Sequence, residues 1–131
     1  GVKLFKSDRE GCPDGGQRRD FIYVKDVVAA TLHFLKLEAP PRGLYNVGTG
    51  TARSFADLAR ATFAALGVKE NIEYIPMPQD LKGRYQYFTQ ATTAKLRASG
   101  FAQPFHSLEE GVRDYVCNHL MASSPRTETQ Q

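Results

Sequence analysis

Cysteine, histidine and long apolar runs are scarce in this sequence, and the scarcity of each argues against a particular kind of protein. The two cysteines, Cys12 and Cys117, have the spacing of neither a disulfide framework nor a metal site, which favours a reducing, cytoplasmic compartment. The three histidines are scattered, and no Ser- or Cys-based catalytic arrangement accompanies them. No segment reaches the roughly 18 apolar residues of a membrane helix. We therefore expect neither a metal site nor a membrane partner.

The motifs of a dinucleotide-dependent active site are also missing. A Gly-x-Gly-x-x-Gly fingerprint between a strand and a helix would cradle a pyrophosphate, but the chain has only Gly48-Thr49-Gly50, which predicts a tight turn. None of the six tyrosines has a lysine four residues later, so no Tyr-x-x-x-Lys pair exists. We expect no catalytic residue and no tightly bound cofactor in these residues.

The charge balance is mildly basic, with a net charge of +3 and a pI near 9.0. A nucleic-acid footprint needs lysines and arginines on one face, whereas here they are spread among acids. We therefore expect no nucleic-acid partner, and an anionic small ligand suits the balance at least as well. The 41% hydrophobic and 24% charged fractions are ordinary for a globular chain.

Strand and helix patterns alternate along the chain, which predicts an α/β fold. Turn formers make residues 7–17 a loop, and Ser54 with Asp57 and Ser107 with Glu110 have capping-box spacing. We expect one domain over residues 1–122 and a disordered polar tail over 123–131. The expected strands are residues 2–5, 20–24, 45–47 and 71–75, and the expected helices are 26–37, 54–66, 91–98 and 107–120.

Two segments have the composition of half of an anion site. In Gln17-Arg18-Arg19-Asp20, a pair of guanidiniums leads from a loop into a strand, and guanidinium donors match phosphate oxygens. In Lys82-Gly83-Arg84-Tyr85, glycine permits a close backbone approach and tyrosine offers a flat face with a hydroxyl. Taken singly, each also fits a plain alternative: solvated arginines paired locally with Asp20, and an ordinary surface turn.

With their surroundings, these segments resemble the ADP-L-glycero-D-manno-heptose 6-epimerase family of extended short-chain dehydrogenases. Arg19-Asp20-Phe21-Ile22-Tyr23-Val24-Lys25-Asp26-Val27 and Tyr45-Asn46-Val47-Gly48-Thr49-Gly50 are similar to segments shared across that superfamily. The stretch 72–91, which includes Lys82-Gly83-Arg84-Tyr85, is similar to the heptose epimerases in particular. The resemblance implies the carboxy-terminal, substrate-binding portion of such an enzyme, without its amino-terminal Rossmann half.

The resemblance also implies an activity and a set of ligand-binding residues. Family enzymes hold NADP in the Rossmann domain and invert C6 of an ADP-linked heptose by transient oxidation and reduction, on the way to the lipopolysaccharide inner core. The family's ligand-binding arginine and tyrosine fall on Arg19 and Tyr85. Its Phe-Glu-Gly-Ser run falls on Phe5, Lys6, Ser7 and Asp8, where only the first residue is the same.

Two other interpretations stay open. The chain fits a piece of another sugar-nucleotide epimerase or dehydratase, or a non-catalytic binding or self-associating module derived from one. Apolar residues of the expected helix 26–37, among them Val27, Val28, Leu32, Phe34 and Leu35, spread around most of its circumference. Because a chain of this size cannot cover them all, we expect a homo-oligomer.

Overall fold

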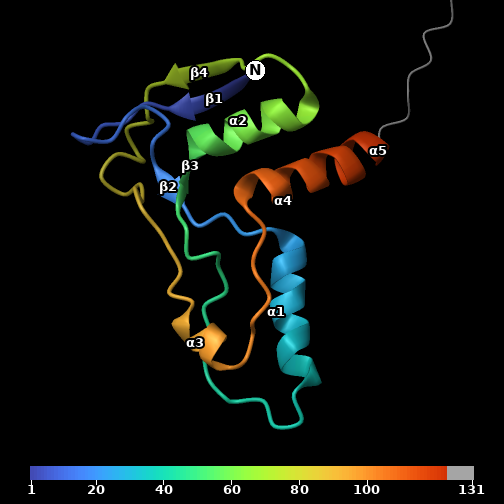
Figure 1. Ribbon diagram of the computed structural model, residues 1–131. Coiled ribbons are helices and arrows are strands. Elements are labelled where there is room, and N and C mark those ends of the chain that lie inside the picture. The colour runs from blue at the N-terminus through green and yellow to red at the C-terminus, as the bar shows by residue number, and fades with distance from the viewer. Residues whose placement is uncertain (124–131) are drawn as a thin grey trace, which may run out of the picture.

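The computed structural model describes residues 1–123 and has the mixed α/β fold class that the sequence predicts. Strand β1 (Val2–Phe5) pairs in parallel with β4 (Ile72–Ile75), with Val2 opposite Ile72 and Phe5 opposite Ile75. Strand β2 (Arg18–Arg19) pairs antiparallel with β3 (Arg53–Ser54). Both sheets have two strands, and helix α2 (Phe55–Leu66) lies below β1 and β4 in Figure 1.

Helix α1 (Val24–Lys36) extends away from these sheets, beside the short helix α3 (Ala94–Ala98) (Figure 1). A small core joins them, in which Ala30 of α1 packs with Leu96 of α3 and with Phe101. Only the α3 side of α1 is covered in this way, and the opposite side carries exposed apolar residues. The helix is therefore apolar on more than one side, as its sequence predicts.

The last described residues form helix α4 (Leu108–Tyr115), a π-helical turn η1 (Val116–Leu120) and α5 (Met121–Ser123). Both predicted capping boxes are confirmed: the Ser54 hydroxyl accepts from the Asp57 backbone N–H, and the Ser107 hydroxyl accepts from that of Glu110. The predicted stop at Gly67 is confirmed by its left-handed backbone, with φ of 67°. The tail predicted over 123–131 lies outside the described residues except for Ser123.

Two predicted strands, 20–24 and 45–47, are wrong. The backbone of Tyr23 is extended, with φ of −75° and ψ of 139°, but its carbonyl accepts from the Asp26 and Val27 N–H groups at the start of α1 and it belongs to no β-ladder. Among residues 1–123, no further strand lies beside either segment. A sequence can favour extended backbone, but a strand also needs a partner for its N–H and C=O groups.

Candidate functional site

Three of the six predicted site residues meet in one place. The Tyr85 ring stands edge-on to the Phe5 ring, with centroids 5.9 Å apart, and the Arg19 guanidinium carbon lies 5.4 Å from the Tyr85 centroid. The same guanidinium carbon lies 5.8 Å from the centroid of Phe55, the first residue of α2. We call Phe5, Arg19, Phe55 and Tyr85 the arginine–aromatic cluster. It joins the end of β1, strand β2, the start of α2 and the 82–85 turn.

Arg19 is half-buried in this cluster and has no carboxylate partner among residues 1–123. Within residues 1–123, the one hydrogen bond of its side chain runs from Nη1 to the Arg18 carbonyl, at 2.8 Å. A guanidinium has five N–H donors in a planar fork, so most of its capacity is not used by a protein acceptor. Since aromatic faces hold a cation without consuming these donors, the arrangement suits an incoming anion.

The suggestion that Asp20 pairs with the neighbouring arginines is wrong. Its carboxylate instead accepts from the Thr49 backbone N–H at 2.8 Å, the Thr49 hydroxyl at 2.5 Å, and the backbone N–H groups of Gly50 and Ala91 at 2.9 and 3.0 Å. Burial raises the pKa of this carboxyl, but the hydrogen bonds outweigh burial and hold the pKa below its usual value. Asp20 thus ties three segments together directly beside Arg19.

The other three predicted site residues, Lys6, Ser7 and Asp8, lie just beyond the end of β1, in a loop that is hydrogen-bonded to itself. The Ser7 backbone N–H donates to Asp14 at 2.8 Å, and the Ser7 hydroxyl donates to the Arg9 carbonyl at 3.1 Å. The Lys6 side chain is exposed and makes no ion pair with a described residue. The hydrogen bonds of Ser7 therefore shape the loop.

Tyr87, which the sequence interpretation passed over, fixes this loop. Its hydroxyl accepts from the Asp8 backbone N–H at 3.0 Å and donates to the Asp8 carboxylate. The Arg9 guanidinium lies 4.4 Å from the Tyr87 centroid, and the Tyr87 ring stands edge-on to Tyr85. The one feature of the sequence that points to Tyr87 is its position two residues after Tyr85, as a second tyrosine in the same segment. Tyr87 thus connects the β1 loop to the arginine–aromatic cluster.

Arg18 and Arg19 are adjacent in the sequence, but their side chains lie in different surroundings. Arg18 is exposed and lines an open hollow of about 630 Å³ together with Arg9 and Tyr87. The other predicted cations, Lys82 and Arg84, are exposed on a turn whose Gly83 has φ of 74°, and neither makes an ion pair with a described residue. The structure therefore places Arg19 beside Tyr85 and leaves the remaining cations of the two segments outside the cluster.

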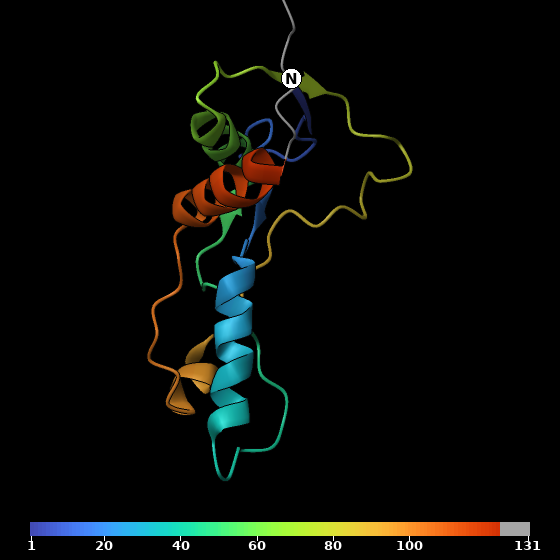
Figure 2. The same ribbon diagram turned by 90° about the vertical axis from the view of Figure 1, so that its right-hand side faces the viewer.

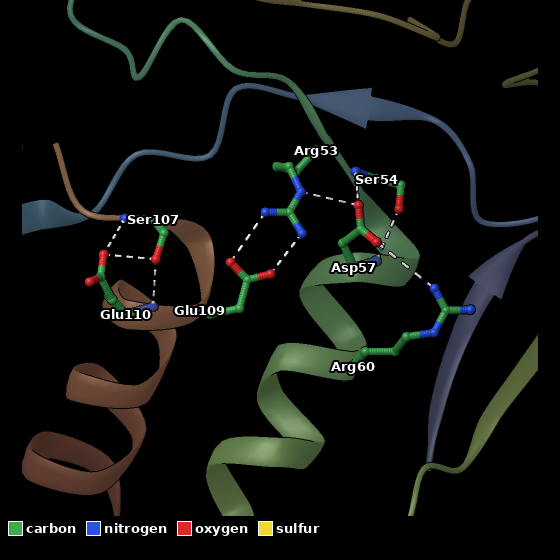
Figure 3. Close-up of polar contacts among 7 residues, drawn as sticks. All are labelled: Arg53, Ser54, Asp57, Arg60, Ser107, Glu109 and Glu110. Atoms are coloured by element: carbon green, nitrogen blue, oxygen red, sulfur yellow. Dashed lines mark hydrogen bonds and ion pairs between the residues drawn. The ribbon is translucent and has the colours of Figure 1, made fainter.

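A charged link holds the start of α2, and hence Phe55, in position (Figure 3). The Arg53 guanidinium donates to both oxygens of Glu109 on α4, at 2.7 and 3.2 Å, and to Asp57 at 3.3 Å. These bonds raise the pKa of Arg53 and lower that of Glu109. Burial raises the pKa of Asp57, but its bonds from Ser54 and Arg53 outweigh burial and lower it. All three groups are thus charged at neutral pH.

Within residues 1–123, no three or more His, Cys, Asp or Glu side chains lie together in a way that could hold a metal ion. His106 Nδ1 lies 2.7 Å from the fully buried Asp26 carboxylate, which also accepts from the His106 backbone N–H at 2.9 Å. This pair joins the start of α1 to the segment before α4. Cys12 is half-buried and Cys117 is exposed, both as free thiols. None of the helices described in residues 1–123 has the length and apolar character to cross a membrane.

Comparison with known proteins shows which enzymes this chain resembles. The profile of the NAD dependent epimerase/dehydratase family matches residues 2–48. An ADP-L-glycero-D-manno-heptose-6-epimerase of Fusobacterium nucleatum is 53% identical over 125 residues, which are 91% of this chain and 37% of that protein. One of Nitratidesulfovibrio vulgaris is 47% identical over 124 residues, 95% of this chain and 38% of that protein. The resemblance to the heptose epimerases is confirmed.

Solved structures agree with this resemblance. The crystal structure of the Helicobacter pylori ADP-L-glycero-D-manno-heptose-6-epimerase has a TM-score of 0.71 and 31% identity, covering 92% of this chain and 33% of that one. A Thermus thermophilus UDP-glucose 4-epimerase in complex with NAD has a TM-score of 0.70 and 28% identity, covering 94% and 36%. The chain thus spans about a third of the length of the heptose epimerases that it matches.

Proposed function

We propose that this chain is the nucleotide-sugar-binding part of an ADP-L-glycero-D-manno-heptose 6-epimerase. The observation that carries the proposal is Arg19, a half-buried guanidinium held between Tyr85 and Phe55, to which no carboxylate of residues 1–123 is paired. A guanidinium with free donors binds a diphosphate by charge-assisted hydrogen bonds. The sequence relatives support ADP-linked heptose as the nucleotide sugar.

In this proposal the residues of the cluster have separate tasks. Arg19 donates to the diphosphate, and Tyr85 presents its ring face and hydroxyl to the adenosine or sugar portion. Phe5 supports the Tyr85 ring edge-on. Lys6 adds a solvated positive charge at the mouth of the β1 loop, while Ser7 and Asp8 keep that loop in shape through Asp14 and Tyr87.

The chemistry itself belongs to groups that these 131 residues do not contain. Inversion at C6 by transient oxidation and reduction requires a bound NADP and an acid/base pair, and the chain has neither the glycine fingerprint nor the Tyr-x-x-x-Lys pair that supply them. We infer that a separate nucleotide-binding part, of the Rossmann type, supplies both in the complete cytoplasmic enzyme. The product would serve lipopolysaccharide inner-core synthesis.

A second candidate is the binding part of a different nucleotide-sugar epimerase. The likeness to a UDP-glucose 4-epimerase, at 28% identity, supports it more weakly than the 53% identity to a heptose epimerase supports the first. The two candidates differ in the nucleotide that the ligand contains. Titration with ADP and with UDP therefore separates them, because an adenosine-specific site discriminates against UDP and a uridine-specific site does the reverse.

Calorimetry of the chain with ADP tests the proposal. Removing one charge-assisted contact costs about 1.5–3 kcal/mol, so Arg19→Ala should raise the Kd for ADP roughly 10- to 150-fold. Arg42→Ala, a charge-matched change in an exposed loop, is the control and should stay within about twofold. Arg18→Ala tests the other side of β2. If it abolishes binding while Arg19→Ala does not, the ligand occupies the hollow lined by Arg18 and the assignment is wrong.

A further inference from the structure

Gln17 is a buried side chain whose amide has a partner at one end only. It is 2% exposed, and it lies in the loop directly before β2. Its Nε2 donates to the Lys6 carbonyl at 3.4 Å, but no N–H or O–H group of residues 1–123 donates to its Oε1. The other buried polar side chain among these residues, Asp26, is paired with His106. A buried acceptor without a donor costs free energy, so the free Oε1 calls for an explanation.

The hydrogen bond to Lys6 fixes which end of the amide is free. If the amide were turned over, Oε1 would face the Lys6 carbonyl oxygen, and two acceptors would meet. Every fully enclosed side-chain nitrogen or oxygen of residues 1–123 has a hydrogen-bond partner. Because Oε1 has none, it is not fully enclosed, and part of the small exposed area of Gln17 belongs to this atom. Oε1 is therefore within reach of a bound ligand.

Gln17 borders the arginine–aromatic cluster. Its side chain contacts Lys6, the residue directly after Phe5 at the end of β1. Its carbonyl accepts from the Phe55 backbone N–H at 3.1 Å, at the start of α2. In Figure 2, the chain after β4, which carries Tyr85, bends outward on the side away from α2 before it returns towards β2. Gln17 thus joins two of the segments that form the cluster.

The alternation of side chains along β2 places Gln17 on the same side as Arg19. The bond from Phe55 to Gln17 continues the antiparallel ladder of β2 with β3 by one residue. Successive side chains of a ladder point to opposite faces, so Gln17 and Arg19 share one face and Arg18 has the other. Arg18 lines the open hollow described above, and Arg19 lies in the cluster. Gln17, with its unused oxygen, therefore shares a face with the unused donors of Arg19.

We propose that Gln17 Oε1 accepts a hydrogen bond from a sugar hydroxyl of the ligand whose diphosphate Arg19 holds. The inference rests on the function proposed above. A diphosphate offers acceptors, so it fits the guanidinium donors but gives nothing to an amide oxygen. A sugar joined to the diphosphate carries hydroxyl groups, which donate. Gln17 thus recognises the sugar part of a nucleotide sugar, and Arg19 binds its phosphates.

A neutral amide suits this position better than a carboxylate. A carboxylate would also accept from a hydroxyl, but its negative charge would repel the diphosphate beside it. A ligand without the hydroxyl leaves Oε1 without a donor, and an unpaired polar group of this kind is how a binding site rejects an analogue that lacks one hydroxyl. The site should therefore favour a nucleotide sugar or a nucleoside diphosphate over free pyrophosphate.

Calorimetry of the chain with pyrophosphate, ADP and ADP-glucose tests the inference. Gln17→Met keeps the length of the side chain and removes its amide. The Kd for a ligand that contains the hydroxyl should rise roughly 3- to 10-fold, since one neutral hydrogen bond is lost, and the Kd for pyrophosphate should stay within about twofold. A rise with both ADP and ADP-glucose assigns the hydroxyl to the ribose, and a rise with ADP-glucose alone assigns it to the hexose. Gln103→Met, at an exposed position after α3, is the matched control and should leave all three Kd values unchanged.

The comparison between ligands separates recognition from a structural role. An equal rise for all three ligands, pyrophosphate included, or no rise for any of them, overturns the inference. The side-chain amide resonance of Gln17 in the wild-type NMR spectrum gives a second measurement, which does not depend on how a variant folds. It should shift more with ADP or ADP-glucose than with pyrophosphate, and an equal shift or none overturns the inference. If Arg19→Ala weakens pyrophosphate binding but these comparisons fail, only the role of Gln17 is wrong. If the wild type binds none of the ligands, the proposed function is wrong as well.

Discussion

The Asp20→Asn substitution tests whether the carboxylate beside Arg19 organises the site. The Asp20 carboxylate accepts two hydrogen bonds at Oδ1 from Thr49, and two at Oδ2 from the Gly50 and Ala91 backbone N–H groups, at 2.9 and 3.0 Å. An asparagine that keeps its oxygen toward Thr49 turns its NH₂ toward Gly50 and Ala91. The backbone N–H groups of these two residues then face a hydrogen-bond donor instead of an acceptor. The residue keeps its size, so packing is unchanged.

The magnitude follows from the two lost bonds. Hydrogen bonds to a charged group contribute about 1.5–3 kcal/mol each, so two account for about 3–6 kcal/mol in a dry site. Asp20 is half-buried and water can replace part of the loss, so we expect a fall of about 3 kcal/mol in the free energy of unfolding. Urea denaturation measures it. Asp80→Asn, at an exposed turn position, is the matched control and should change stability by under about 0.5 kcal/mol.

The pH dependence gives an independent check. The pKa of Asp20 is lower in the folded chain than its usual value, so its contribution to stability is present above the unfolded-state pKa near ~3.9 and is lost as the pH falls through the folded-state pKa. The stability gap between wild type and Asp20→Asn should therefore be full at pH 6 and shrink below about pH 4. A loss under about 1 kcal/mol at pH 6, or a gap that widens in acid, refutes the role of Asp20.

Two further outcomes are expected. Arg53→Met removes the link from β3 to Glu109 on α4 and should lower the free energy of unfolding by about 1 kcal/mol, whereas Arg60→Met, whose ion pairs are longer than 3.6 Å, should have almost no effect in the same urea assay. The chain by itself should not interconvert the two ADP-heptose epimers in the presence of NADP, since it has no glycine fingerprint or Tyr-x-x-x-Lys pair. Measurable turnover by the purified chain would contradict that inference.

Local signals predicted the helices well. The hydroxyls of Ser54 and Ser107 cap α2 and α4 as their spacing indicates, and Gly67 ends α2 in the left-handed conformation. These features depend on residues within one helical turn of each other, so no knowledge of the rest of the molecule is needed. The predicted strands at 2–5 and 71–75 also exist, with the second beginning at Ile72, but their parallel pairing joins residues about 70 positions apart.

The sequence indicated some residues of the candidate site but not how they lie relative to one another. Arg19 and Tyr85 were chosen as chemically suited, and their resemblance to family positions agreed, but nothing in the sequence brought one within 5.4 Å of the other. Phe55 begins α2 on the other side of Arg19, and no local pattern in the sequence indicates that its ring lies beside the guanidinium. Tyr87 was not recognised, because its contacts with Asp8 and Arg9 cross 79 and 78 positions of the chain.

The sequence by itself determined where α2 and α4 begin and where α2 ends, which residues are chemically able to bind an anion, and that the motifs of cofactor chemistry are absent from these 131 residues. Only the tertiary structure decided that the Asp20 carboxylate accepts from backbone N–H groups of distant segments, and that residues 20–24 and 45–47 pair with no strand of residues 1–123. The physical reason is the same in each case. A cap or a turn is satisfied by its neighbours in the chain, whereas a carboxylate, a guanidinium or an extended backbone takes whichever partner the fold brings near.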